Sequence, residues 1–110
     1  MKTTNFKKFE TKTIKSIRLI AIHTAKKRCS DKLEKLILRV VELTLKEVGK
    51  IAYVLHRSID NPDELMFYEI WKDEQSLQSH FKLPYIGTVL EKMKSILAKP
   101  VELKKYLEVR

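Results

Sequence analysis

Hydrophobic and polar side chains alternate with a period of two in four stretches of the chain. These stretches are residues 16–24, 50–59, 65–72 and 101–109. Successive side chains of a strand point to opposite faces of a sheet, so each stretch is predicted to be a β-strand. In the first three stretches both faces are mostly apolar, which is typical of a sheet that is covered on both sides.

The clearest helical spacing runs from residue 30 to residue 48. The residues of its predicted inner face recur three and four positions apart, as Leu33, Leu36, Ile37, Val40, Thr44 and Val48. Ser30 or Asp31 can cap the start of this helix, and Asp31 with Glu34 resembles a capping box. Gly49 is expected to end the helix, in a conformation with positive φ.

A second helical region is divided by a proline. Asp73 is a good N-cap for a short helix to about residue 82, and Pro84 suits the first turn of a following helix. The spacing of that helix continues to Leu97, and Pro100 closes it. Upstream, the turn signal at 60–63 (Asp-Asn-Pro-Asp) makes the two flanking strands an antiparallel hairpin.

The predicted order of elements is β-α-β-β-α-β, with the second helix broken at Pro84. This order belongs to the α+β ferredoxin-like fold, in which an antiparallel four-stranded sheet has its helices on one face. The helices cover only that face. We therefore expect the other apolar face to meet the same face of a second copy, which makes a homodimer.

Residues 1–15 are predicted to form a polar, basic, flexible arm, and residues 16–110 a single domain. Phe6 and Phe9 are the only aromatic residues of the arm. We favour a frayed tail. The alternative is an arm whose two phenylalanines dock on a second subunit.

A net charge of +9 would suit a nucleic-acid partner, but the arrangement of the charge argues against one. Five of the lysines lie in the first fifteen residues, and most other basic residues have acidic neighbours. There is no cluster of arginine with aromatic residues. Charge alone supports only non-specific attraction to phosphate, so no specific nucleic-acid partner is expected.

The apolar runs and the cysteine content indicate where in the cell the protein is expected to lie. No apolar run reaches the about 20 residues of a membrane span, so no membrane partner is expected. Cys29 is the only cysteine, which excludes an intrachain disulfide. This usage fits a reducing compartment, and we expect a cytoplasmic protein.

The three histidines do not form a metal-binding pattern. His23, His56 and His80 include no HxxxH or HxH pair. Zinc and iron sites need three or more converging ligands with recognisable spacing. We therefore expect no protein-bound metal.

Two polar residues stand among apolar ones and are candidates for chemistry. His80 follows Leu77 by three positions and should overhang the sheet, where a neutral imidazole can exchange a proton with a phenol or enol. Alternatively, it is a half-buried histidine bonded to a backbone carbonyl. Glu69 interrupts an apolar strand face, and its structural alternatives are pairing with Arg18 or Arg57, or bonding a backbone donor.

The aromatic residues supply walls for a cavity between sheet and helices. They are Tyr53, Phe67, Tyr68, Trp71 and Tyr85. Most are expected to be core. A cavity lined by such rings and a few polar groups would suit a small planar organic molecule.

Four short motifs occur in a fixed order along the predicted domain. Residues 47–53 (EVGKIAY) and 55–58 (LHRS) enter and continue the second strand. Residues 67–71 (FYEIW) lie on the third strand, and 77–81 (LQSHF) on the short helix. Over about residues 17–108 this arrangement resembles the antibiotic-biosynthesis monooxygenase domain family, with its E-x-G-C-x-x-Y, fyE-x-W and L-x-x-H-hydrophobic patterns.

The resemblance implies both an assembly and a reaction. Members of that family are dimeric ferredoxin-like α/β barrels. Several are small oxygenases that oxidise aromatic quinols or polyketides with molecular oxygen and without metal or flavin. This chain would then be a cofactor-independent monooxygenase that deprotonates an electron-rich enol or phenol, whose carbanion itself reduces oxygen.

Three positions depart from the family pattern. Lys50 replaces the common cysteine after the glycine, and Leu83-Pro84-Tyr85 replaces a frequent S/T-P-H, so a second histidine is missing. The helical histidine that ligates haem in haem-degrading relatives falls near Leu90. Haem degradation of that type is therefore not expected.

Our first hypothesis is a small oxygenase in which His80 is catalytic. The predicted substrate-binding side chains are Tyr53, His56, Glu69, Trp71 and Tyr85. One alternative is a non-catalytic ligand-binding or stress-response dimer on the same scaffold. Another is an isomerase or lyase, which needs the same acid–base group but no oxygen.

Overall fold

The computed structural model describes residues 16–109 of the chain, and the predicted arm at residues 1–15 lies outside them. Its elements are β1 (Ile17–Thr24), α2 (Ser30–Thr44), β2 (Lys50–Arg57), β3 (Glu64–Trp71), α3 (Glu74–Phe81), α4 (Pro84–Met93) and β4 (Glu102–Leu107). The four strands form one sheet in the order β2-β3-β1-β4. All neighbouring strands are antiparallel.

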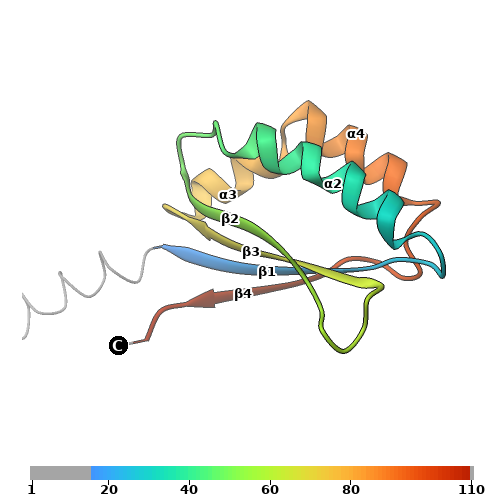
Figure 1. Cartoon of the computed structure of the whole chain (residues 1–110). Helices are drawn as coiled ribbons and strands as arrows, with labels where there is room; N and C mark the ends of the chain where they lie inside the picture. Colours follow the sequence, from blue (N-terminus) through green and yellow to red (C-terminus); the bar gives the residue numbers. More distant parts are fainter. Residues whose placement is uncertain (1–15, 110) are drawn as a thin grey trace, which may run out of the picture.

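The three helices α2, α3 and α4 lie together on one face of this sheet (Figure 1). The β2–β3 hairpin and the order of elements are those predicted from the alternation of apolar residues. The α+β ferredoxin-like fold is therefore confirmed.

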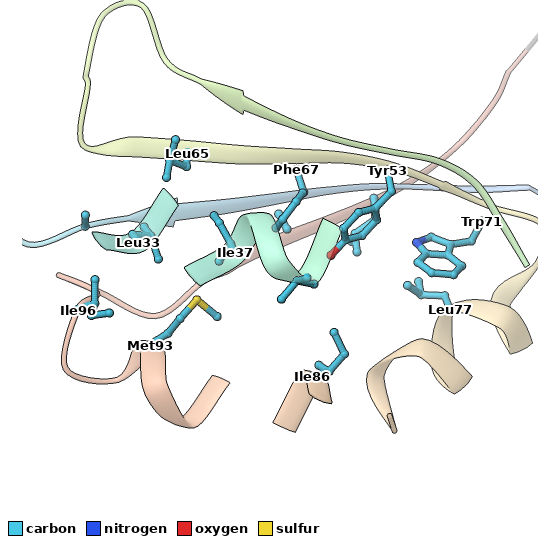
Figure 2. Close-up of a cluster of buried hydrophobic side chains, with 14 residues drawn as sticks. Leu33, Ile37, Tyr53, Leu65, Phe67, Trp71, Leu77, Ile86, Met93 and Ile96 are labelled. Atoms are coloured by element: carbon cyan, nitrogen blue, oxygen red, sulfur yellow. The ribbon is translucent and has the colours of Figure 1, made fainter. Parts of the chain in front are cut away.

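The core lies between the sheet and the helices (Figure 2). Leu19, Leu65 and Trp71 contribute from the strands, and Leu33 and Leu77 from the helices; all five are essentially inaccessible to solvent. Burying a large apolar side chain contributes roughly 1.5–3 kcal/mol, so this layer supplies most of the favourable folding energy. It also fixes α3 against the end of β3, because Trp71 and Leu77 are adjacent (Figure 2).

The opposite face of the sheet has no second layer within residues 16–109 (Figure 1). Its centre, on β1 and β3, is mostly apolar, whereas β4 places Lys104 and Glu102 beside Ile20 and Ile22. Ile20 and Ile22 of β1 and Tyr68 of β3 are only half-buried there, and Val54 of β2 is 48% exposed. The prediction that both strand faces are apolar while helices cover only one therefore holds in the structure.

Several predicted helix ends were wrong. Helix α2 ends at Thr44 rather than at residue 48, with Leu45 as its C-cap. Its N-cap is Cys29, without a side-chain hydrogen bond, so the predicted cap at Ser30 or Asp31 is absent. Helix α4 ends at Met93, before the predicted Leu97. By contrast, Asp73 caps α3 as predicted, accepting a hydrogen bond from the Ser76 amide at 2.8 Å.

Gly49 has a different role from the predicted one. No glycine of the described region has positive φ, so Gly49 does not end α2 by that means. Instead, α3 approaches it closely, and a Cβ at this position would overlap the Cβ and Oγ of Ser76. Glycine is needed at position 49 because any side chain there would push α3 away. The position of α3 in turn decides where the residues after it lie.

Gly49→Ala is expected to lower the free energy of unfolding by about 1–3 kcal/mol, because the added methyl group forces the turn before β2 away from α3. Gly87→Ala is the matched control. Gly87 lies inside α4 with open space around it, so that change should stabilise by about 0.5–1 kcal/mol. Urea unfolding measures both. A Gly49→Ala, Ser76→Gly double variant should recover stability, and equal effects of the two alanine substitutions would refute the close-approach explanation.

Candidate functional site

A cavity of about 200 Å³ lies between the sheet and the helices. Most of its wall is apolar, with Phe67 from β3, Ile86 and Met93 from the α4 side, and Leu103 from β4 among the lining residues. Four of its lining residues carry polar groups, namely His23, Tyr53, Glu69 and His80. A concave, mostly apolar space with a few polar groups is typical of a site for a small organic ligand.

His80 reaches the cavity from α3 and is 2% exposed. Its ring lies 4.6 Å from the Trp71 ring and 5.6 Å from the Tyr53 ring, centroid to centroid. Burial lowers the pKa of His80 below 6.5, although Glu47 opposes this effect. At neutral pH the imidazole is therefore uncharged and able to accept a proton.

Glu47 holds the imidazole in place. Its Oε2 lies 2.9 Å from Nδ1 of His80. A carboxylate accepts hydrogen bonds, so the neutral ring carries its proton on Nδ1, and Nε2 keeps its lone pair. Tyr85 donates its hydroxyl to the same carboxylate oxygen, and its own oxygen lies 3.0 Å from the Thr44 hydroxyl.

The early end of α2 and the turn before β2 explain how Glu47 meets His80. α2 ends early at Thr44, so the chain turns and brings Glu47 beside α3 instead of continuing the helix past it. The pKa of Tyr85 is raised to about 12, chiefly by burial and then by its bond to Glu47. Tyr85 thus stays protonated and acts as a donor that fixes the carboxylate.

Glu69 is a buried carboxyl group on the sheet side of the cavity. Its Oε1 accepts a hydrogen bond of 2.8 Å from Nε1 of Trp71. Burial raises the pKa of Glu69 to about 7, with the Trp71 bond opposing and Glu47 adding to the shift. Near neutral pH the group can therefore either donate or accept a proton.

Tyr53 lies across the β2–β3 pair from Glu69. Its ring lies 4.6 Å from that of Phe67, so the two rings form an aromatic wall of the cavity. Burial, followed by the charge of Glu69, raises the pKa of Tyr53 well above its usual value. The phenol is therefore a hydrogen-bond donor at all ordinary pH values.

The structure brings together only part of the predicted site. Tyr53, Glu69 and His80 line the cavity. Trp71 and Tyr85 do not; they stand behind Glu69 and Glu47 as hydrogen-bond donors. The prediction that Trp71 and Tyr85 form cavity walls is therefore wrong.

His56 was placed incorrectly. It alternates with Tyr53 and Leu55 along β2, so its side chain lies on the uncovered face, exposed, with Nδ1 3.1 Å from the Val54 carbonyl. It is not part of the cavity lining.

The structural alternatives considered for the two polar residues were also wrong. Glu69 pairs with neither arginine, because Arg18 pairs with Glu108 and Arg57 with Glu34. His80 bonds a carboxylate rather than a backbone carbonyl.

Sequence reasoning missed three residues that belong to this site. Glu47 was noticed only as the first letter of the E-x-G motif, which is the signal that could have found it. Thr44 looked like a core position of a longer helix. His23 lies on the cavity side of β1, and the sequence had assigned it no role.

Residues 16–109 contain no group of three or more histidine, cysteine, aspartate or glutamate side chains arranged to hold a metal ion. In the same part of the chain, no helix has both the length and the apolar composition needed to cross a membrane.

The fold and the site together define a small α+β protein with a histidine–carboxylate pair at an apolar cavity. The sequence model of the antibiotic biosynthesis monooxygenase family matches residues 16–92. The chain therefore belongs to the antibiotic biosynthesis monooxygenase family, as the four motifs indicated.

Solved structures share the fold of this chain. The crystal structure of a conserved protein from Methanosarcina mazei Go1 is 29% identical, with a TM-score of 0.81 over 90% of this chain and 96% of that chain. A structure described as an antibiotic biosynthesis monooxygenase is 21% identical, with a TM-score of 0.81 over 86% of this chain and 99% of that chain. At that identity, the second likeness shows the fold alone.

One curated relative is similar in sequence. An uncharacterised protein of Synechocystis sp. (strain ATCC 27184 / PCC 6803 / Kazusa) is 33% identical over 66 residues, or 60% of this chain. The match spans 45% of that protein, so this chain corresponds to less than half the length of its relative.

Proposed function

We propose that this protein is a cofactor-independent monooxygenase that oxidises a small aromatic quinol or enol with molecular oxygen. The observation that supports the proposal most is the His80–Glu47 pair beside an apolar cavity. A neutral histidine held by a carboxylate is a general base with a fixed tautomer. Family membership supports the same reaction class.

The first step of the proposed reaction is deprotonation. Nε2 of His80 takes the proton of the substrate hydroxyl, and Glu47 stabilises the imidazolium that forms. Glu69 and Tyr53 line the cavity, and in the proposed reaction they hydrogen-bond oxygen atoms of the substrate. Bound substrate would displace water from the apolar wall, which would strengthen these contacts.

The second step uses the electrons of the deprotonated substrate. Dioxygen accepts an electron pair from the ring carbon, in one-electron stages, and a carbon–oxygen bond forms. The peroxide takes up a proton and the carbon loses its hydrogen as a proton. The O–O bond then breaks, so that one oxygen atom stays on the product and the other leaves as water.

Oxygen uptake by the purified protein with a panel of quinols and enols tests the proposal. Substrate-dependent uptake with one water formed per oxygen consumed is expected. Turnover of the same compounds under anaerobic conditions would instead indicate an isomerase or lyase using the same base. Tight retention of a metabolite with no turnover would favour a ligand-binding protein.

We also propose that the protein forms a homodimer through the uncovered face of its sheet. Ile20, Ile22, Val54 and Tyr68 make the centre of that face apolar, and no element within the described region covers it. A face of this kind is stabilised when a copy of itself excludes water from it.

Light scattering should give twice the 13.0 kDa mass of one chain. Tyr68→Asp puts a charge in the centre of the proposed interface and should raise the dissociation constant about 30-fold or more. Leu38→Asp, which changes an exposed leucine of α2, is the matched control and should leave the dimer intact. A monomeric wild-type protein would contradict this assembly.

A further inference from the structure

Two separate hollows lie on either side of the His80–Glu47 pair. The apolar cavity is lined by His80 but not by Glu47. A second hollow, the outer groove, has a volume of about 540 Å³ and is lined by Glu47 but not by His80. Ser76 and Ser79 of α3 and Lys46 of the turn before β2 are among its other lining residues. The pair therefore forms part of the wall between the cavity and the outer groove.

The two oxygen atoms of Glu47 face different surroundings. Oε2 takes part in both hydrogen bonds of the carboxylate, with Nδ1 of His80 at 2.9 Å and with the Tyr85 hydroxyl. Oε1 has no partner within residues 16–109, yet it is not among the buried atoms of that region that lack one. Oε1 therefore meets water at the outer groove. The carboxylate thus connects a ring that is 2% exposed with solvent.

The other carboxyl group of the site does not provide such a connection. Glu69 lines the cavity, and its hydrogen bond goes to Nε1 of Trp71. An indole N–H donates a hydrogen bond but has no lone pair to accept a proton. A proton on Glu69 therefore cannot pass through Trp71, whereas imidazole and carboxylate can each accept a proton and release one.

The proposed reaction gives a use to a path between the cavity and water. After deprotonation, the substrate anion must persist until dioxygen reacts with it. A proton that stays on His80 lies beside that anion and can return to it. Transfer of the proton to water prevents this return.

We propose that Glu47 carries the substrate proton from His80 to water in the outer groove. Nε2 of His80 takes the proton of the substrate hydroxyl, and Nδ1 gives its own proton to Oε2 of Glu47. A half-turn of the carboxyl group, about a torsion with a broad two-fold preference, brings this proton to the groove, where water takes it. His80 is left neutral, with its proton on Nε2.

The same path runs in reverse later in the cycle. When the peroxide takes up a proton, Nε2 supplies it, and Nδ1 regains one from the groove through Glu47. No proton is gained or lost over the whole cycle. These two uses rest on the proposed function, but the path itself is a property of the protein without substrate.

Water-exchange NMR measures the path directly, without substrate. In Glu47→Gln the amide oxygen still accepts the Nδ1 hydrogen bond, but the amide cannot carry the proton onward. The exchange of the Nδ1 proton of His80 with water should therefore slow by about tenfold or more. A Glu47 that only positions the ring predicts the opposite, because a bond to a neutral acceptor is weaker and protects the proton less.

Closing the outer groove is a second test, which leaves the His80–Glu47 pair intact. Ser79 lines the groove on the exposed side of α3, so Ser79→Phe should keep water from Glu47 and slow the exchange by about tenfold. Ser79→Leu should slow it less. Gln78→Phe is the matched control, because Gln78 is exposed on the same helix and does not line the groove. It should exchange at the wild-type rate.

Turnover gives an independent readout. With oxygen and a substrate, Ser79→Phe should lower kcat by about tenfold and leave KM within about twofold, because the cavity that binds the substrate is unchanged. Circular dichroism confirms that each variant is folded.

A folded Glu47→Gln or Ser79→Phe protein that exchanges the His80 proton at the wild-type rate, or faster, would overturn the inference. Unequal rates for Gln78→Phe and the wild type would do the same, because the effect would then not depend on the groove. Failure of the wild type to consume oxygen would count against the proposed oxygenase alone, since the exchange of the His80 proton is measured without turnover.

Discussion

Replacing His80 by alanine should lower the rate of oxygen uptake by about 10²–10⁴-fold, the usual contribution of a positioned general base. The reason is that Nε2 of His80 would be the proton acceptor at the cavity, held by the 2.9 Å contact of Nδ1 with Glu47. Glu47→Gln should give a smaller loss, because the ring keeps its place but loses the charge that stabilises its protonated form.

The pH dependence of the rate provides a second test of His80. A base must be uncharged to act, and burial lowers the pKa of His80 below 6.5. The rate should therefore rise with pH only in the acidic range and be level above about 6.5. Glu47→Gln removes the partner that opposes the shift, so the acid limb should move to lower pH.

Gln78→Ala is the control for the His80 variants, because Gln78 lies on the same helix with its side chain exposed and bonded to Glu74. Its rate should equal that of the wild type. His80 is itself buried, so each variant must be shown by circular dichroism to be folded before its rate is compared. A folded His80→Ala protein with the wild-type rate would remove His80 from the mechanism.

Replacing Glu69 by glutamine should make the protein more stable at alkaline pH, by about 3 kcal/mol, and leave its stability near pH 4 nearly unchanged. Burial raises the pKa of this carboxyl from 4.5 to about 7 in the folded protein. Between these values the folded state binds more protons than the unfolded state. The wild type therefore loses stability as the pH rises from 4.5 to 7, and the loss is complete above 7.

Glutamine keeps the contact that holds Glu69 in place. Its amide oxygen can accept the Trp71 hydrogen bond as the carboxyl does. Urea unfolding at pH 5 and at pH 8 gives the difference. Glu91→Gln changes an exposed glutamate of α4 and should show no such pH-dependent gain. A gain for Glu69→Gln that is the same at both pH values would argue against a buried, protonated carboxyl.

The raised pKa of Glu69 also connects stability with the proposed reaction. A carboxyl that titrates near neutral pH can hydrogen-bond a substrate oxygen in either protonation state. The apolar surroundings keep the pKa of Glu69 raised, and burying this carboxyl group lowers the stability of the protein. Such a cost is common where a site requires a group that folding alone would exclude.

The periods of the apolar residues determined the secondary structure and, through it, the fold. Alternation over four stretches and helical spacing between them are local properties, so the order β-α-β-β-α-β could be found from the sequence. The ends of α2 and α4 could not be found from the sequence. The stripe of apolar residues continues past the last helical residue, because the apolar side chains of the following turn also pack against the core. Gly49 shows the same limit, since its role depends on the distant Ser76.

Sequence motifs identified Tyr53, Glu69 and His80, but only the tertiary structure decided what surrounds them. Glu47 lies 33 positions from His80, and Tyr85 lies 38 from Glu47, so no local pattern could show that the three bond one another. The face of β2 on which His56 lies follows from its register with β3. Hydrogen bonds between distant residues depend on positions in space, which folding alone creates. The sequence thus determined the scaffold and the family, and the packing of α3 and the turn after α2 against the sheet decided the site.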